Sequence, residues 1–382
     1  MIYLDHAATA PVRREALEAM WPFLTGEFGN PSSHHGLGES AAAGLDGARR
    51  AVAAVLGARA GGVVFTGSGT EADNLAVKGI ALGAPRGRHL ITTPLEHEAV
   101  LSSVDYLVRV HGFTADHLTP DEHGRVRPED LAALIRPDTT LVSVQYANNE
   151  IGTVQPIAEL AAVARGHRVP FHTDAVQAAG WLELDVTALG VDALSLSGHK
   201  VGAPKGVGVL WAATRLALEP VVHGGGQERG RRSGTENVAG AVALATALSA
   251  AEAERTVVGP RVAALRDRFV AEVLRTVPGA RLTGDPRHRL PGTASFVFAG
   301  THGEAVLLEL ERRGVVCSSG SACAAGSDEP SHVLTALGLP AGLARTAVRC
   351  TFGPQSTEQE ADLAARAVAD AVAAVRGLQP TG

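Results

Sequence analysis

Short hydrophobic runs alternate with longer amphipathic segments from about residue 60 to about residue 236. The short runs predict buried strands, and segments whose apolar residues recur every three or four positions predict helices. This alternation is typical of a mostly parallel sheet covered by helices on both faces. The predicted strands are about 63–65, 89–92, 113–118, 140–146, 169–173, 193–196 and 207–211, and the predicted helices are about 13–21, 39–56, 70–82, 97–110, 128–135 and 156–165.

The pattern changes after about residue 236, where two long amphipathic segments, 237–255 and 261–277, predict two helices. Shorter elements follow: strands at 294–298, 315–317 and 347–352, and helices at 303–313, 330–337 and 357–375. This second part predicts a smaller α+β domain. We therefore expect a large domain over residues 13–250 and a small domain made of residues 1–12 and 251–382.

Ligands of parallel sheets bind at the carboxyl ends of the strands, so the residues that follow each strand matter most. Gly67-Ser68-Gly69-Thr70 follows the strand 63–65 and opens a helix. Backbone N–H groups and hydroxyls there would suit a phosphate, although an ordinary helix cap explains the same residues.

Two titratable residues also follow predicted strands. Asp174 ends the strand 169–173, where its carboxylate could pair with a protonated ring nitrogen or simply cap a turn. His97 opens a helix within Glu96-His97-Glu98, where it could stack on a flat cofactor or move protons, or lie on the surface between two acids.

The three lysines are unevenly placed. Of 34 Lys and Arg residues only Lys78, Lys200 and Lys205 are lysines, and two of them lie in the turn after the strand 193–196. A neutral, nucleophilic amine must be lysine, because guanidinium does not deprotonate in proteins. This turn could therefore hold a Schiff-base lysine, or it could be a solvated surface turn.

Composition narrows the class of protein. The chain has 382 residues, 45% of them hydrophobic, with a net charge of −6, which fits a globular enzyme and not a protein that mainly binds nucleic acid. The N-terminus has no basic leader and no apolar run, and no segment is long enough to cross a bilayer. We expect a cytoplasmic protein without membrane contact.

The three cysteines, Cys317, Cys323 and Cys350, match no zinc-binding spacing, and we interpret them as free thiols. Cys323 lies in a Ser/Gly-rich run without apolar periodicity, which is where a nucleophile that must travel would be placed. Cys317 ends a strand and Cys350 lies within one, so both are interpreted as core thiols. Cys317 has an alternative, because it lies six residues from Cys323 and could form a disulfide with it.

Seven stretches, in this order, resemble one enzyme family. They are Tyr3-Leu4-Asp5-His6-Ala7-Ala8-Thr9, Phe28-Gly29-Asn30-Pro31-Ser32-Ser33, Thr70-Glu71-Ala72-Asp73-Asn74, Asn148-Asn149-Glu150-Ile151-Gly152, Ser197-Gly198-His199-Lys200, Arg232-Ser233-Gly234-Thr235 and Ser318-Ser319-Gly320-Ser321-Ala322-Cys323. The chain resembles the fold-type I pyridoxal-phosphate enzymes, and within them the NifS/IscS-like group I cysteine desulfurases. The implied fold is α/β, with a mostly parallel seven-stranded sheet and a smaller α+β domain.

The resemblance also implies a role for each matching residue. Lys200 would be the Schiff-base lysine, His97 a catalytic residue stacked on the cofactor ring, and Cys323 the persulfide-forming nucleophile. Arg349, Asn30 and Asn149 would bind substrate. The residues implied to hold pyridoxal 5'-phosphate are Gly69, Thr70, His97, Asn149, Asp174, Gln177, Ser197, His199, Lys200 and, from a second subunit, Thr235.

The implied reaction converts L-cysteine to L-alanine and leaves the sulfur as a persulfide on Cys323. The acceptor would be a protein: an iron–sulfur scaffold, a thiolation enzyme or a sulfur carrier. The enzyme would be a homodimer with no resident metal, and Cys323 is a candidate for a transient iron–sulfur ligand. Alternatives are a selenocysteine lyase or aminotransferase on the same fold and, more distantly, a carrier without enzymatic activity.

Overall fold

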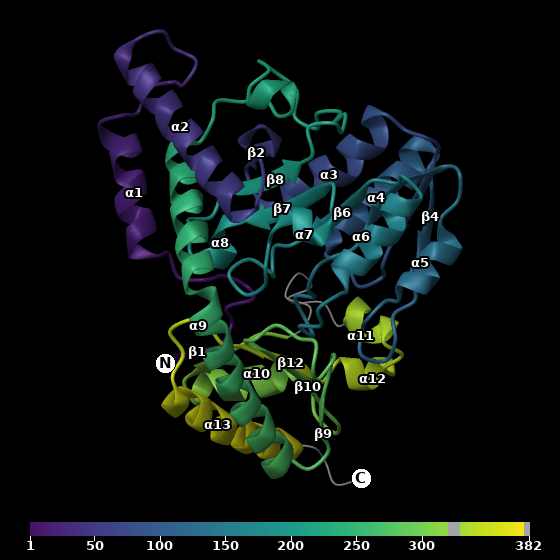
Figure 1. Ribbon diagram of the computed structural model, residues 1–382. Coiled ribbons are helices and arrows are strands. Elements are labelled where there is room, and N and C mark those ends of the chain that lie inside the picture. Colours follow the sequence, from purple (N-terminus) through teal and green to yellow (C-terminus); the bar gives the residue numbers. More distant parts are fainter. Residues whose placement is uncertain (320–328, 378–382) are drawn as a thin grey trace.

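The computed structural model describes residues 1–319 and 329–377 of the chain (Figure 1). Its larger part is built on a seven-stranded sheet in the order β2-β8-β7-β6-β5-β3-β4. The strands from β7 through β4 pair in parallel, while β8 is antiparallel to both β7 and β2. The strands are β2 Val63–Thr66, β3 His89–Thr92, β4 Thr114–His117, β5 Thr139–Ser143, β6 Phe171–Asp174, β7 Ala193–Ser197 and β8 Gly208–Ala212.

Helices cover both faces of this sheet, as the sequence pattern predicts. The helices are α1 Arg14–Thr25, α2 Gly36–Val55, α3 Gly69–Gly83, α4 Glu98–His111, α5 Pro128–Leu134, α6 Ile157–Gly166, α7 Val186–Leu189 and α8 Gly198–Val201, with 3-10 turns at Ala60–Gly62 and Glu228–Gly230. One core cluster joins α3 and α4 to one face of the sheet, and another joins α2, α6, α7 and α9 (Val238–Thr276) to the other.

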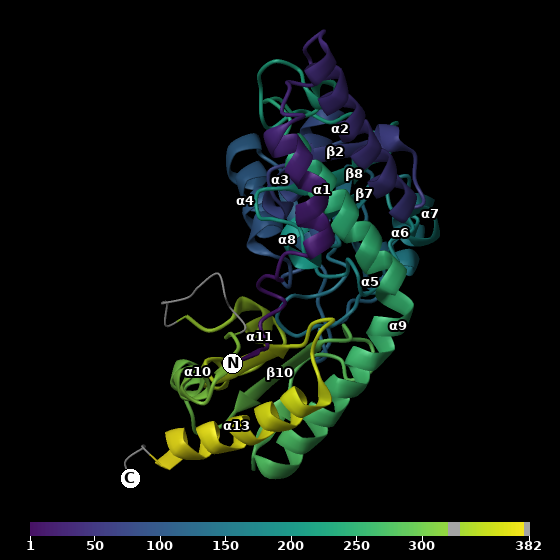
Figure 2. The same ribbon diagram turned by 90° about the vertical axis from the view of Figure 1, so that its left-hand side faces the viewer.

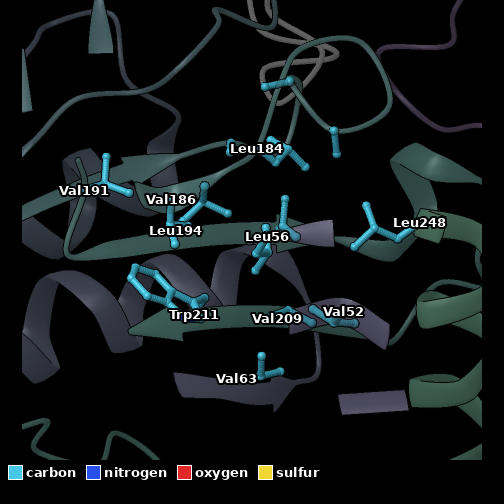
Figure 3. Close-up of a cluster of buried hydrophobic side chains, with 14 of the residues drawn as sticks. Val52, Leu56, Val63, Leu184, Val186, Val191, Leu194, Val209, Trp211 and Leu248 are labelled. Atoms are coloured by element: carbon cyan, nitrogen blue, oxygen red, sulfur yellow. The ribbon is translucent and has the colours of Figure 1, made fainter. Parts of the chain in front are cut away.

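Apolar side chains that point alternately to the two faces of the sheet explain why both faces are buried. In β8, Val209 and Trp211 pack toward α2 and α9, whereas Leu210 between them packs toward α3. Figure 3 shows the first of these clusters, in which Val52 and Leu56 of α2 lie near Val209. Successive side chains of a strand point to opposite faces, so a doubly covered strand is apolar at nearly every position.

The smaller part packs helices against a three-stranded antiparallel sheet, β12-β10-β9, and a two-stranded parallel sheet, β1-β11. Its core includes Leu4 together with residues from 262 to 375. The elements are β1 Ile2–Tyr3, β9 Ala280–Leu282, β10 Thr293–Phe298, β11 Val315–Val316, β12 Ala347–Thr351, α10 Gly303–Arg312, α11 His332–Ala336, α12 Ala341–Ala344 and α13 Glu358–Gly377.

Two predicted helix boundaries are wrong. The segments 237–255 and 261–277 form the single helix α9 of 39 residues, which continues through Pro260, and α1 likewise continues through Pro22 to Thr25. Proline removes one backbone hydrogen bond but its φ is helical, so packing on both sides can keep the helix intact. Here Leu248 belongs to the large core and Phe269 to the small one, and Figure 2 shows α9 running from one part to the other. The predicted boundary at residue 250 therefore lies inside a helix.

Candidate active site

The carboxyl ends of β5, β6 and β7 carry a polar patch on the face that α3 covers. In β7 the residues directed to that face are Ala193, Ser195 and Ser197, and the leucines between them belong to the opposite core. In β6 the same alternation places His172 and Asp174 on the α3 side, while Phe171 packs in the opposite core. Polar side chains of β6 and β7 thus extend along the α3 face to the carboxyl ends of the strands, where a ligand would bind.

The N-terminus of α3 lies directly against the end of β7. A Cβ on Gly69 would come within 2.9 Å of Val176 Cγ2 and 3.0 Å of Ser197 Cβ, so only glycine permits this approach. Ser68 caps the helix by accepting from the N–H of Glu71, and Thr70 is exposed. Free helix N–H groups beside the Ser197 hydroxyl make an anion-binding corner.

Lys200 lies in the single turn α8, which begins immediately after β7. Its Nζ donates to the carbonyl oxygens of Ala7 and, at 2.7 Å, of Ala8. Lys205 is exposed, and Lys78 stands over the Tyr106 ring. Lys200 is therefore the lysine that the fold brings to the carboxyl edge of the sheet.

Asp174 ends β6 and is buried beside Lys200. Its Oδ1 accepts from the N–H of Val176 at 2.9 Å. Burial raises the pKa of its carboxyl, while the nearby His97 and Lys200 act in the opposite direction. Gln177, one turn further, donates from Nε2 to the carbonyl oxygen of Ala7 at 3.0 Å. A buried carboxylate with nearby cations is suited to hold a cationic ring nitrogen.

A second buried acid, Asp73 of α3, lies behind Asp174 and was not anticipated from the sequence. Burial, together with the charge of Asp174, raises the pKa of Asp73 well above its usual range. Its Oδ1 lies 3.8 Å from His172 Nε2 and has no hydrogen-bond partner within residues 1–319 and 329–377. Burial lowers the pKa of His172 to about 3, so the imidazole is neutral.

Serine hydroxyls connect the buried His172 to the neighbouring strands β5 and β7. His172 Nε2 lies 2.9 Å from Ser195 Oγ, and its Nδ1 lies 2.9 Å from Ser143 Oγ. The Ser195 hydroxyl is also within hydrogen-bonding reach of Asp73. An acid at an apolar position of a helix is a signal that sequence reasoning could have used, since Asp73 lies between the buried Ala72 and Ala76.

His97 caps α4, and its Nδ1 accepts from the N–H of Ala99 at 3.1 Å. The idea that it lies on the surface between two acids is wrong, because Glu96 is fully buried. Glu96 Oε1 accepts from the N–H of Gln145 at 3.0 Å and from Thr93. Burial raises the pKa of Glu96 to about 8. Glu96 is therefore a buried residue that fixes the start of α4 through its hydrogen bonds, not an exposed acid beside His97.

His199 lies in α8 beside Lys200 and the N-terminal segment. Its Nδ1 is 3.1 Å from the hydroxyl of Thr9. Burial, followed by the positive charges of Lys200 and Lys205, lowers its pKa to about 4. The imidazole is neutral near pH 7 and can donate one N–H to an anion without adding charge.

Arg349 of β12 links the smaller part to this edge. It is 1% exposed, and it donates to Asp5 Oδ1 at 2.8 Å and to the backbone carbonyl of Asn149 at 2.9 Å. Its Nε is buried and finds no hydrogen-bond partner among the described residues. An arginine with an unsatisfied donor beside the site is suited to take up a carboxylate.

Two predicted residues lie on exposed segments. Asn30 occupies an exposed turn between α1 and α2, where its Oδ1 accepts from the N–H of Ser32 at 2.9 Å. Figures 1 and 2 show this turn at the end of the large part that is remote from β12. Thr235 is also exposed, in the segment before α9. The ion pair of Arg232 with Glu71, at 2.8 Å, ties that segment to the start of α3.

A cavity of about 710 Å³ adjoins Lys200 on the side of α9. It is lined by both parts of the molecule, among them His6, Gln177, Trp181, Glu254 and Phe352. A cavity of this size is large enough for a small amino acid. Cys323 lies outside the described residues, while Cys317 and Cys350 are free thiols in the smaller part.

Comparison with known proteins shows which family the chain belongs to. The aminotransferase class-V model matches residues 2–363. The chain belongs to the aminotransferase class-V family. It is 44% identical to a protein named cysteine desulfurase IscS of Dictyoglomus turgidum, over 94% of this chain and 91% of that one.

Solved structures agree with this assignment and with the predicted fold class. A NifS-like protein superposes with a TM-score of 0.90 at 35% identity, covering 97% of this chain and 98% of that one. A structure described as SspA in complex with cysteine has a TM-score of 0.80 at 36% identity, covering 94% and 100%. The α/β fold and the family predicted from the sequence are confirmed.

Class V family members that are cysteine desulfurases use pyridoxal phosphate. The residues of the site in this chain fit that cofactor. The helix corner at Gly69 fits a phosphate, because a Cβ there would fill it. The buried Asp174 fits the ring nitrogen, and Lys200 fits the aldehyde. Within the part of the chain that is described, there is no cluster of three or more His, Cys, Asp or Glu side chains suited to a metal, and no described helix is long and apolar enough to cross a membrane.

Proposed function

We propose that this protein is a pyridoxal-phosphate-dependent cysteine desulfurase that converts L-cysteine to L-alanine and transfers the sulfur to Cys323. The observation that carries the proposal is that Lys200, Asp174 and the N-terminus of α3 meet at one edge of the sheet. The 44% identity to a named cysteine desulfurase supports the choice of reaction.

The α3 corner and the adjoining turn would hold the phosphate. The N–H groups at Gly69 and Thr70, the Ser197 hydroxyl and one N–H of the neutral His199 are the donors. Because His199 carries no charge near pH 7, the anion would be held mainly by hydrogen bonds and the α3 dipole.

Asp174 and Gln177 would orient the ring, and His97 would cover one of its faces. The bound cofactor supplies an electron sink for a carbanion at the substrate Cα. Asp174 stabilises the positive ring nitrogen on which that sink depends, and protonated Asp73 leaves Asp174 as the one negative charge of the pair.

Lys200 would hold the cofactor covalently and, once displaced by substrate, would take the proton from Cα. Arg349 and Asn149 would position the substrate carboxylate, with Arg349 exchanging Asp5 for it. This exchange keeps the guanidinium paired throughout, which avoids leaving a buried charge unsatisfied.

Cys323 would then attack the substrate Sγ as a thiolate. The S–C bond breaks, L-alanine is released and Cys323 carries the sulfane sulfur as a persulfide, so one cysteine and one thiol give one alanine and one persulfide. A protein acceptor, whether scaffold, thiolation enzyme or sulfur carrier, would remove it.

We also propose that the enzyme is a cytoplasmic homodimer with shared active sites. Thr235 and Asn30 are exposed in their own chain, where a second copy could contact them and place them at its site. The ion pair between Arg232 and Glu71 fixes the base of the segment that carries Thr235.

A single-turnover experiment tests the reaction. Protein loaded with pyridoxal phosphate is mixed with one equivalent of L-cysteine without reductant, alkylated and mapped by mass spectrometry. We expect one alanine per active site and one persulfide on Cys323, and no persulfide in Cys323→Ser. Keto-acid formation without alanine, or sulfur release in Cys323→Ser equal to that of the unmodified protein, would contradict the proposal.

A further inference from the structure

Cys317 and Cys350 are neighbours in the smaller part, although the mechanism uses neither. Cys317 follows β11, and Cys350 lies within β12. Both are free thiols, and the side chain of Cys317 is near enough to Cys350 to affect its pKa. The sequence did not suggest that these two cysteines are neighbours, so their proximity is a product of the fold.

The backbone fixes how the two residues face each other. Ser318 and Arg349 form an antiparallel bridge and exchange both hydrogen bonds, at 3.2 Å and 2.7 Å. Cys317 and Cys350 are the next residue on each chain; one residue further, Leu4 lies between the two segments, donating to Val316 and accepting from Thr351. A hydrogen-bonded antiparallel pair such as Ser318 and Arg349 has Cα atoms about 5.5 Å apart, and disulfides span about 4.4–6.8 Å, so the neighbouring cysteines are placed for a disulfide.

The two thiols differ in access to solvent. Cys350 is 0% exposed, whereas Cys317 is partly exposed and packs against the edge of the small core. The neighbouring Cys317 thiol, together with burial, raises the pKa of Cys350. A soluble oxidant therefore meets Cys317 first, and Cys350 stays a protonated thiol until its neighbour has reacted.

We propose that Cys317 and Cys350 are an oxidation site, forming a reversible disulfide when the protein meets a hydroperoxide. The sulfur of Cys317 attacks the O–O bond and becomes a sulfenic acid, releasing water or an alcohol. The sulfur of Cys350 then attacks the sulfenic sulfur, the S–S bond forms, and the hydroxyl leaves as water with the Cys350 proton. Two thiols lose two electrons and two protons, and one hydroperoxide is reduced.

The bond would act on the region that carries the proposed chemistry. It would close residues 318–349, a stretch that includes Cys323, into a covalent loop. It would also join β12 covalently to the residue that follows β11. This bond would lie next to the existing backbone bridge between Arg349 and Ser318. A cross-link of this length restricts the unfolded chain, so the oxidised protein should be the more stable form.

The test uses Cys323→Ser protein, because it leaves only two of the three cysteines. The protein is treated with one equivalent of hydrogen peroxide, denatured and titrated for thiols. We expect two thiols before treatment and none after it, and a tryptic link between peptides 314–345 and 350–366. Dithiothreitol should restore both thiols, and the oxidised protein should melt a few degrees higher than the reduced one.

The matched control is Cys317→Ser in the same background, which should keep its single buried thiol under the same treatment. Cys350→Ala, which avoids a buried hydroxyl, should instead yield sulfenic or sulfinic acid on Cys317 and no link. The proposal is overturned if the Cys323→Ser protein keeps both thiols, or if Cys317 is oxidised to sulfinic acid while Cys350 remains free. Neither outcome depends on desulfurase activity, so this test and that of the proposed function can fail separately.

Discussion

Arg349 donates to Asp5 across 344 residues of sequence, with 2.8 Å between Nη2 and Oδ1. The carboxylate of Asp5 therefore occupies the guanidinium that we assign to the substrate carboxylate. We predict that Arg349→Ala weakens cysteine binding about 10- to 100-fold, because a charge-assisted pair is worth about 1.5–3 kcal/mol. Spectral titration of Cys323→Ser protein with L-cysteine measures the dissociation constant, and cofactor affinity should change far less.

The matched variant is Asp5→Asn, which keeps an acceptor for Arg349 but removes the competing charge. We expect it to bind cysteine at least as tightly as the unmodified protein and to lose roughly 1–3 kcal/mol of stability. Unchanged cysteine affinity in well-folded Arg349→Ala would show that Arg349 is purely structural.

Lys200→Ala should abolish the yellow colour of the lysine-bound cofactor, whereas Lys205→Ala should keep it. The reason is that Lys200 donates to the carbonyls of Ala7 and Ala8 beside Asp174, whereas Lys205 is exposed. Borohydride reduction followed by peptide mapping locates the attachment. A cofactor adduct on Lys205 or Lys78 would refute the assignment.

Asp174 and Asp73 form a buried pair of carboxyl groups, and each can be replaced by asparagine, which has the same shape. Asp174→Asn should weaken cofactor binding about 10- to 100-fold, because it removes the charge that holds the ring nitrogen. Asp73→Asn should bind the cofactor within about threefold of the unmodified protein, since an amide imitates the neutral acid expected there. Equal losses in both variants, measured by cofactor titration, would mean that the charge is shared between the two carboxyls.

Glu96 should make the protein less stable as the pH rises. Burial raises its pKa to about 8 in the folded state, so between about pH 4.5 and pH 8 the folded protein binds more protons than the unfolded chain. Its contribution is fully present below that window and is lost through it. In Glu96→Gln apoprotein the loss of stability from pH 5 to pH 8 should be smaller by on the order of 1–4 kcal/mol. Urea unfolding at both pH values measures this, and parallel pH profiles of the two proteins would count against a protonated Glu96.

Subunit mixing tests whether Thr235 acts across an interface. Lys200→Ala and Thr235→Glu homodimers should each be inactive, the second because a carboxylate would repel the partner's phosphate. Random mixing should restore about a quarter of full activity, because half of the dimers are mixed and each holds one intact site. The control mixes Lys200→Ala with Arg349→Ala, which should show no recovery beyond the residual activity of Arg349→Ala, because both residues act within one chain. No recovery in the first mixture, or equal recovery in both, would rule out this division of the site.

The sequence determined most of the local structure and the family. Strand β3 has the predicted bounds, 89–92, and most other elements differ by only a few residues, because alternating and helical apolar patterns are local properties. The motif Ser197-Gly198-His199-Lys200 predicted which lysine lies at the carboxyl edge of the sheet for the same reason: strand, turn and lysine are contiguous. The class V family was predicted from such stretches and is confirmed.

Only the tertiary structure decided the relationships that join distant segments. The sequence predicted two helices, 237–255 and 261–277, yet α9 is continuous through Pro260 because its two halves are held in two different cores. The apolar neighbours of Asp73 indicate a buried acid, but only the packing of β6 and β7 against α3 gives it His172 and Ser195 as neighbours. The contact of Cys317 with Cys350 depends on a backbone bridge between two strands that no local pattern encodes. A periodic pattern specifies which face of an element is buried, but the partner of a buried polar group is set by how separate elements pack together.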